Sequence, residues 1–153
     1  MRRLPRVMPV LLILLVSAVS SAHAQETEET GQEVGRFTLE QNYPNPFYPN
    51  TRIPFVLGEG YFSEGRQPVV SMRVYNLIRQ PVAVAETLRH PQGRGIPMSN
   101  LRYEAPGRHE GYWDGRDFSG DMVSPGTYWV QLTVNGVSKA KKMIVTEEMI
   151  VTE

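Results

Sequence analysis

The stretch YWVQLTVNGVSKAKKMIV, residues 128–145, decides the fold class of this chain. Its first half alternates apolar and polar side chains, which places Tyr128, Val130, Leu132 and Val134 on one face. A period of two residues is typical of a half-buried β-strand. Asn135-Gly136 then favours a hairpin turn, and residues 137–145 return as a second strand. The pattern therefore predicts an antiparallel hairpin with one buried face.

The register of this hairpin depends on the length of its turn. A two-residue turn at Asn135-Gly136 would place Lys139 and Lys141 on the core face. A three-residue loop through Val137 avoids this, because a slip of one residue moves every side chain to the opposite face. The longer loop pairs Leu132 with Ala140 and Tyr128 with Ile144. We expect this second register, although Lys142 fits poorly in it.

Similar short runs occur upstream, and 13 Gly and 12 Pro residues punctuate the chain. We expect strands at residues 37–41, 52–57, 70–75, from 82 onward and at 109–113, with a long loop at 89–107 that contains a short strand at 98–103. Pro54 lacks an N–H, so its strand is expected at a sheet edge or a bulge. With the final hairpin this makes about seven strands. The prediction is a single all-β domain, an immunoglobulin-like antiparallel β-sandwich over residues 37–146.

The first 24 residues are typical of a signal peptide. Three arginines precede an almost wholly apolar run at residues 10–19, and Ala22-His23-Ala24 offers a small-x-small cleavage site. The apolar run is shorter than the roughly 20 residues that span a bilayer, although an N-terminal membrane anchor is the alternative. We therefore expect an exported protein, periplasmic in transit and then extracellular or on the outer cell surface.

Composition limits what the mature chain does. Cleavage after Ala24 leaves 129 residues with 13 basic and 16 acidic side chains, a net charge of −3, which gives no electrostatic basis for binding nucleic acid or anionic lipid. Cysteine is absent, so neither a disulfide nor a lipid-bearing Cys is available. Residues 25–36 are acidic and are expected to be a disordered linker. Residues 147–153 are expected to form a frayed tail, in which 149–153 repeat the sequence of 143–147.

Three segments carry a resemblance to a known family. The segment LEQNYPNPF at residues 39–47 comes first, followed by Val74-Tyr75-Asn76-Leu77 with Gln80 and Val82. The third is Trp113-Asp114-Gly115 with Gly120, then Pro125-Gly126 and Lys142-Met143. In this order they resemble the C-terminal sorting domains of the type IX secretion system and the immunoglobulin-like domain of flagellar hook-capping proteins. The structural signature comprises Asn42, Pro44, Asn45, Pro46, Phe47, Trp113, Asp114, Gly115, Pro125 and Gly126.

Turn chemistry explains most of the signature. Prolines and asparagines at 42–46 favour a rigid bend that Tyr43 and Phe47 anchor on the sandwich. Pro125-Gly126 suits a type II turn, Asp114-Gly115 another turn, and the Trp113 ring is large enough to plug one end of the core. One departure from the family pattern is Arg79, where members usually carry Gly. If that turn requires a positive φ, Arg79 costs about 1 kcal/mol there.

The resemblance implies a non-catalytic module that mediates secretion or surface protein-protein interaction, with the secretion machinery or other surface proteins as partners. A sorting signal would then lie in Lys142, Met143, Ile144 and Val145. Alternatives are a structural subunit of a surface appendage or matrix and a small carbohydrate-binding module that uses exposed aromatics such as Trp129. A truncated gene that has lost its cargo region is a further alternative, because only residues 25–36 separate the leader from the domain.

No enzyme or cofactor is predicted. His90 and His109 lack metal-ligand spacing, and no nucleophile with a base and an orienting group is recognisable. Asp114, Asp117, Ser119 and Asp121 form a weak calcium candidate, since oxygen ligands alternate in a Gly-bearing loop without the distal bidentate Glu. The sequence leaves the oligomeric state open.

Overall fold

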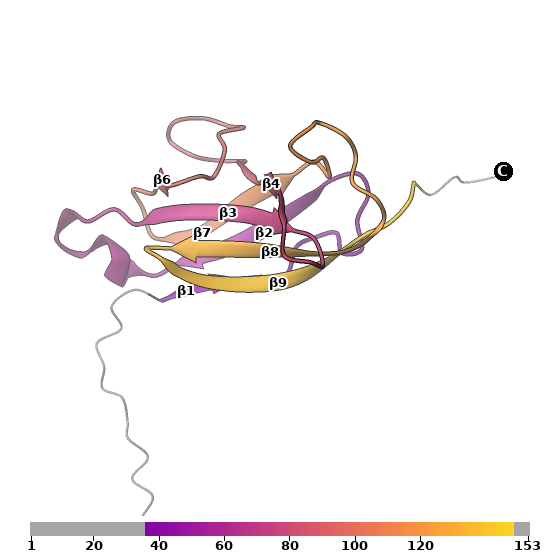
Figure 1. Ribbon diagram of the computed structural model, residues 1–153. Coiled ribbons are helices and arrows are strands. Elements are labelled where there is room, and N and C mark those ends of the chain that lie inside the picture. Colours follow the sequence, from indigo (N-terminus) through magenta and orange to yellow (C-terminus); the bar gives the residue numbers. More distant parts are fainter. Residues whose placement is uncertain (1–35, 149–153) are drawn as a thin grey trace, which may run out of the picture. The chain divides into compact units, whose positions relative to one another are not determined.

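A computed structural model describes residues 36–148. The predicted signal peptide, nearly all of the predicted linker and the repeated segment 149–153 lie outside these residues. Nine strands and one 3-10 helix occur in the described part (Figure 1). In chain order they are β1 (Phe37–Leu39), β2 (Thr51–Leu57), η1 (Glu59–Gly65), β3 (Val69–Tyr75), β4 (Pro81–Val84), β5 (Glu86–Thr87), β6 (Leu101–Arg102), β7 (Gly107–Trp113), β8 (Gly126–Val134) and β9 (Val137–Val145). No helix within residues 36–148 is long and apolar enough to cross a membrane.

The strands form two antiparallel sheets packed face to face. Sheet A has the order β1-β2-β7-β5, and sheet B has the order β4-β3-β8-β9, with β6 also paired to β3. This is the strand order of an immunoglobulin-like sandwich. Near the start of β8 the Tyr128 hydroxyl donates to the Ser124 carbonyl at 2.9 Å, as in the tyrosine corner of such domains. The predicted fold class is confirmed, and besides the seven main strands there are two of two residues each, β5 and β6, of which β6 lies within the short strand expected at 98–103.

Alternating side chains from both sheets fill the core. Ile53, Phe55 and Leu57 of β2 are buried, as the sequence predicted, and so are Val70, Met72 and Val74 of β3. From β8 and β9 the core receives Val130, Leu132, Val134, Met143 and Val145. Each fully buried aliphatic side chain contributes about 1.5–3 kcal/mol, so burial holds this cysteine-free domain together.

The register predicted for the final hairpin is wrong. A two-residue turn at Asn135-Gly136 pairs Leu132 with Lys139 and Val130 with Lys141. These lysines are tolerated because β9 is an edge strand, and their side chains leave the core at its border. Lys139 is exposed, donates to the Phe37 carbonyl and lies 4.7 Å from the centroid of the Phe37 ring. Lys142, which fitted the other register poorly, points outward and is exposed.

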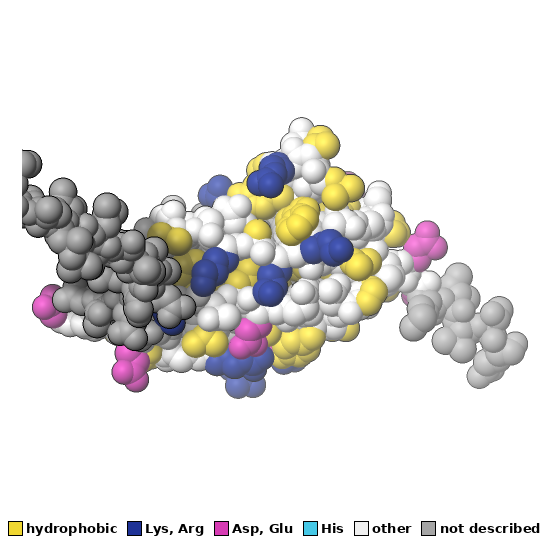
Figure 2. Space-filling view, turned by 90° about the horizontal axis from the view of Figure 1, so that it is seen from below, with side chains coloured by type: hydrophobic (Ala, Val, Ile, Leu, Met, Phe, Trp, Pro, Cys, Tyr) yellow, Lys and Arg dark blue, Asp and Glu magenta, His cyan; other side chains and the backbone are white. Residues whose placement is uncertain are grey.

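The side of the sandwich that carries β1 and β9 is consequently basic. These strands lie at the lower border of Figure 1, and Figure 2 shows that side from below. Lys and Arg side chains are scattered there among hydrophobic ones, with fewer Asp and Glu. An edge strand that carries lysines resists pairing with other sheets, which is a common way of keeping such a strand soluble.

Pro54 does not lie on an edge strand or at a bulge, contrary to the prediction. It belongs to β2, which pairs with β1 on one side and with β7 on the other in an uninterrupted register. The Pro54 carbonyl accepts from the Glu40 N–H at 3.0 Å, just beyond the end of β1. The proline nitrogen faces the same side of the strand and has no N–H to donate, and the ladder between β1 and β2 ends there at Leu39.

The predicted long loop covers the core. Residues 88–100 connect β5 to β6, and the loop is held to sheet B because the Met72 N–H donates to the Met98 carbonyl at 2.8 Å. Met98, Leu101 and Tyr103 are buried, so this segment contributes apolar side chains to the core. The predicted short strand within it is confirmed as β6.

Candidate interaction surface

The first and the third of the segments that carry the resemblance meet at one end of the sandwich. The segment 45–47 lies along the last part of β9, where Phe47 and Val145 pair in parallel. The Phe47 N–H donates to the Ile144 carbonyl at 2.9 Å, and the Asn45 Oδ1 accepts from the Ile144 N–H at 3.0 Å. This segment therefore covers the edge of β9 like a short additional strand.

Trp113 joins the third block to the same end. Its ring packs edge-on against Phe47, with ring centroids 5.5 Å apart, and against Tyr128 at 5.7 Å. Its indole N–H donates to the Arg116 carbonyl at 2.8 Å. Trp113 is 2% exposed, which confirms that it plugs one end of the core. We call residues 42–49, 113–116 and 142–146 together the signature end.

The signature end contains buried and exposed members. Asn42 is buried, and its amide donates to the Pro44 carbonyl at 3.1 Å and to the Thr51 hydroxyl at 3.0 Å. Phe47 is buried as well. The exposed members are Tyr43, Pro44, Asn45, Pro46, Tyr48, Pro49, Asp114, Arg116 and Lys142. The bend thus holds a proline-rich, polar surface rigidly beside the last strand.

The four predicted sorting residues divide in the same way. Met143 and Val145 are buried in the core, Lys142 is exposed and Ile144 is half-buried. Only Lys142 and Ile144 present side chains outward, so any recognition of this strand by a partner involves them together with the covering segment 44–48.

Two details of the predicted turns are different in the structure. Tyr43 does not anchor the bend by burial: it is 42% exposed and its hydroxyl donates to Glu110. Gly126 has a φ of +148°, far from the roughly +80° of a type II turn, and it begins β8 directly. The Asp114-Gly115 turn is confirmed, with Gly115 at φ +77° and the Arg116 N–H donating to Asp114 at 3.0 Å.

The residues considered as calcium ligands lie in a turn that is held by hydrogen bonds. Asp117 Oδ1 accepts from the N–H groups of Ser119 at 2.8 Å and Asp121 at 3.2 Å. Asp114 is already an acceptor for Arg116. Within the part of the chain that the structure describes, no group of three or more His, Cys, Asp or Glu side chains could hold a metal ion.

His90 and His109, the two histidines considered as metal ligands, belong to an aromatic cluster on the margin of sheet A. The rings of His90 and His109 lie 4.9 Å and 4.7 Å from Tyr103, and His109 also packs on Phe55 at 5.5 Å. Burial lowers the pKa of His109 and raises that of Tyr103. The Tyr103 hydroxyl is buried and finds no hydrogen-bond partner among residues 36–148.

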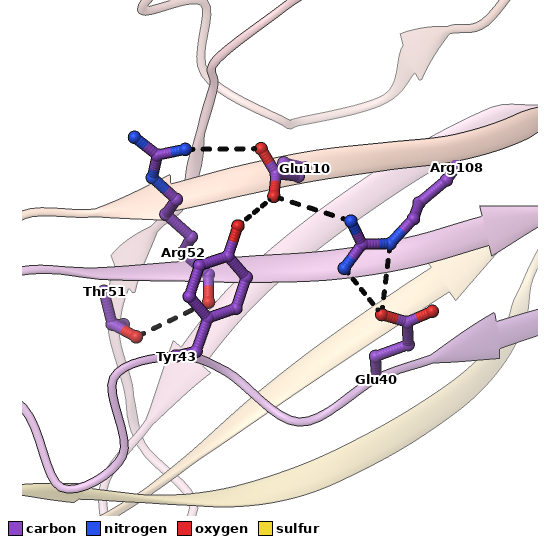
Figure 3. Close-up of polar contacts among 6 residues, drawn as sticks. All are labelled: Glu40, Tyr43, Thr51, Arg52, Arg108 and Glu110. Atoms are coloured by element: carbon purple, nitrogen blue, oxygen red, sulfur yellow. Dashed lines mark hydrogen bonds and ion pairs between the residues drawn. The ribbon is translucent and has the colours of Figure 1, made fainter.

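The outer face of sheet A carries a closed network of charges (Figure 3). Glu110 accepts from the Tyr43 hydroxyl and lies 3.8 Å from the Arg52 guanidinium and 4.0 Å from that of Arg108. Arg108 also forms an ion pair with Glu40 at 3.0 Å, and this carboxylate raises the pKa of Arg108. Within this network the two arginines and the two glutamates neutralise one another.

The outer face of sheet B is different, because its side chains are basic, aromatic and hydroxyl-bearing. Tyr75, Trp129 and Lys142 stand side by side on β3, β8 and β9. Trp129 is 40% exposed, and Leu77 in the adjoining turn is 68% exposed. The sequence indicated Trp129 as an exposed aromatic, but the neighbours that complete this surface come from strands distant in sequence.

Comparisons with known proteins support the fold. No protein-family model matches the chain, and no curated protein matches it. The fold is similar to part of dimeric latent PorU from Porphyromonas gingivalis, with a TM-score of 0.51 and 19% identity over 74% of this chain. This chain spans only 10% of the PorU chain, and at such low identity the likeness establishes the sandwich fold alone.

Two looser superpositions involve other bacterial proteins. PorZ, described as an essential surface component of the type IX secretion system of Porphyromonas gingivalis, gives a TM-score of 0.40 at 19% identity, covering 70% of this chain and 11% of PorZ. A conjugative transposon lipoprotein from Bacteroides eggerthii gives 0.43 at 11% identity, covering 75% of this chain and 99% of the lipoprotein. Scores below 0.5 are too low to support a conclusion about this chain.

Proposed function

We propose that this domain is an exported, non-catalytic interaction module that a secretion apparatus or other surface proteins recognise through the signature end. The resemblance to type IX sorting domains motivates the proposal, and the sandwich fold shared with part of PorU is compatible with it. Four of the side chains considered for chemistry serve structural contacts: Asp114 and Asp117 hold turns, and both histidines pack on aromatic rings.

The observation that carries the proposal is that the first and third sequence blocks meet around β9. Residues 45–47 and 144–146 are about a hundred positions apart, yet their backbones are directly hydrogen-bonded. The bend holds Pro44, Pro46 and Tyr48 on the surface beside Lys142 without making them part of the core. A preorganised loop next to an exposed strand suits recognition, because little conformational entropy is lost when a partner binds.

Export of a reporter protein tests this function. The reporter is inserted between the leader and the domain and expressed in a bacterium with a type IX secretion system and in an isogenic strain without it. We expect the reporter in the medium only when both the system and the domain are present. A reporter that stays in the periplasm of the competent strain would contradict the proposal.

Surface substitutions are more informative than truncation, because deleting β9 would uncover the core beneath Met143 and Val145. Tyr48→Ala and Lys142→Glu should reduce the exported fraction about tenfold, which corresponds to the loss of about 1.4 kcal/mol of recognition. Arg94→Glu makes the same charge change as Lys142→Glu on an exposed loop and serves as the matched control. Unchanged melting temperatures would show that all three variants fold.

A further inference from the structure

The outer face of sheet B forms a continuous track of two adjoining hollows. One, of about 630 Å³, is lined by Tyr75, Leu77, Arg79, Trp129, Gln131 and Ala140. The other, of about 210 Å³, is lined by Ser71, Arg73, Tyr75, Asn100, Gln131 and Thr133. Tyr75 and Gln131 belong to both linings, so the hollows meet across β3 and β8. An elongated ligand fits such a track better than a compact one.

The charge of this face is entirely positive. The outward-facing positions on β3, β8 and β9 alternate with the buried ones, and they hold no Asp or Glu. Arg73 and Lys142 stand on this face, and Arg79 lies in the turn after β3. Within residues 36–148 none of these three cations forms an ion pair with a carboxylate. The face is therefore complementary to an anionic ligand, in contrast to the neutralised network on sheet A.

The neighbouring uncharged side chains indicate what kind of anion binds. Tyr75 and Trp129 stand directly opposite each other and offer two adjacent aromatic rings, which bind the apolar faces of sugar rings well. Gln131, Thr133 and Ser138 adjoin them, and the Thr133 and Ser138 hydroxyls lie 2.7 Å apart. Amide and hydroxyl groups of this kind exchange hydrogen bonds with sugar hydroxyls.

A peptide finds less to bind on this face. β3 and β8 are inner strands whose backbone groups are used by the sheet, so strand addition is not available here. Leu77 is the sole large aliphatic side chain in the linings of the two hollows. We propose that the outer face of sheet B binds an acidic polysaccharide, with Tyr75 and Trp129 stacking on sugar rings and Arg73, Arg79 and Lys142 facing the anionic groups.

Tryptophan fluorescence gives a direct test, because the chain has two tryptophans and Trp113 is buried while Trp129 is exposed. Polygalacturonate added to the mature protein should change the emission of Trp129 and bind more weakly as salt is raised. Neutral dextran should produce no change at the same concentrations. Unchanged emission with polygalacturonate, equal binding of dextran, or binding of polyglutamate in place of polygalacturonate would overturn the proposal.

Variants then locate the site by calorimetry. Trp129→Ala and Arg73→Gln should each weaken polygalacturonate binding about tenfold, the equivalent of one lost stacking or charged contact. Phe118→Ala, which removes another exposed aromatic outside both hollows, is the matched control and should bind normally. Full affinity in the Trp129 and Arg73 variants would refute this location.

This inference shares Lys142 with the proposed export function, but other variants test the two separately. Tyr48→Ala should disturb export while leaving polygalacturonate binding intact, because Tyr48 lines neither hollow. Trp129→Ala should do the reverse. The two assays therefore fail separately if either proposal is wrong.

Discussion

Gly115 is the position at which a single methyl group should do most damage to the signature end. A Cβ built on Gly115 would lie 2.3 Å from the Pro49 carbonyl oxygen, and the backbone there has a φ of +77°. Gly120, in the same loop, has a similar φ of +85°, but a Cβ would meet no atom within 4 Å. The two glycines therefore separate backbone strain from steric contact.

The expected losses of stability follow from the backbone strain and the steric contact. Gly120→Ala places an L-residue in left-handed backbone, which strains the folded state, but it also makes the unfolded chain less flexible, which favours folding. The net loss in the free energy of unfolding is about 1 kcal/mol. Gly115→Ala bears the same strain, and in addition the backbone around Pro49 must move by roughly 1 Å, an overpacking cost of about 2 kcal/mol. We expect the free energy of unfolding to fall by about 3 kcal/mol for Gly115→Ala.

Thermal and urea unfolding of the mature protein measure this difference. At about 4 °C per kcal/mol for a domain of this size, Tm should fall by about 12 °C for Gly115→Ala and about 4 °C for Gly120→Ala. Equal losses for the two variants would refute the reasoning, since they would mean that the turn after Trp113 does not press on the bend at residues 42–49.

Three further changes test other parts of the structure. Tyr128→Phe removes the hydrogen bond to the Ser124 carbonyl and should lower the free energy of unfolding in urea by about 1 kcal/mol; an unchanged value would show that this corner contributes nothing. Burial lowers the pKa of His109 below its usual 6.5, so the unfolded chain takes up this proton first as the pH falls. The stability that this shift contributes is fully present above about pH 6.5 and is lost as the pH falls through that value toward the lower folded pKa. His109→Gln should therefore flatten the dependence of Tm on pH. The same slope of Tm against pH in the variant and the original protein would contradict this. Arg79 has a φ of +60°, so Arg79→Gly should raise stability by up to about 1 kcal/mol while Arg79→Ala leaves it unchanged, as followed by Tm.

Much of the fold could be predicted because the local pattern of apolar side chains in each strand indicates which face is buried. A period of two residues assigned Ile53, Phe55 and Leu57 to one face of their strand and Val130, Leu132 and Val134 to one face of theirs, and both sets are buried as expected. The positive φ suspected at Arg79 is also present, since the turn that joins β3 to β4 requires it whatever residue stands there. The hairpin register was mispredicted because the patterning rule treats a lysine on the inner face as forbidden. On an edge strand it is not, since Lys139 reaches past the border of the core.

The candidate surfaces were less accessible to prediction. Trp129 and the residues 142–145 were recognisable in the sequence, but their division into exposed Lys142 and buried Met143 depends on the register. The track on sheet B joins Tyr75 to Trp129 and Lys142 across three strands, and no local pattern reveals that these side chains are neighbours.

The fold class follows from local patterning: short alternating runs without cysteine or helical periodicity build a β-sandwich, because the side-chain period dictates which face of each strand is buried. The folded arrangement was needed to show which strands lie at the edges, where lysines are tolerated, and which distant segments meet around β9. The physical reason is that burial, strand pairing and charge neutralisation depend on neighbours in space, and in a sandwich those neighbours come from strands far apart in the chain.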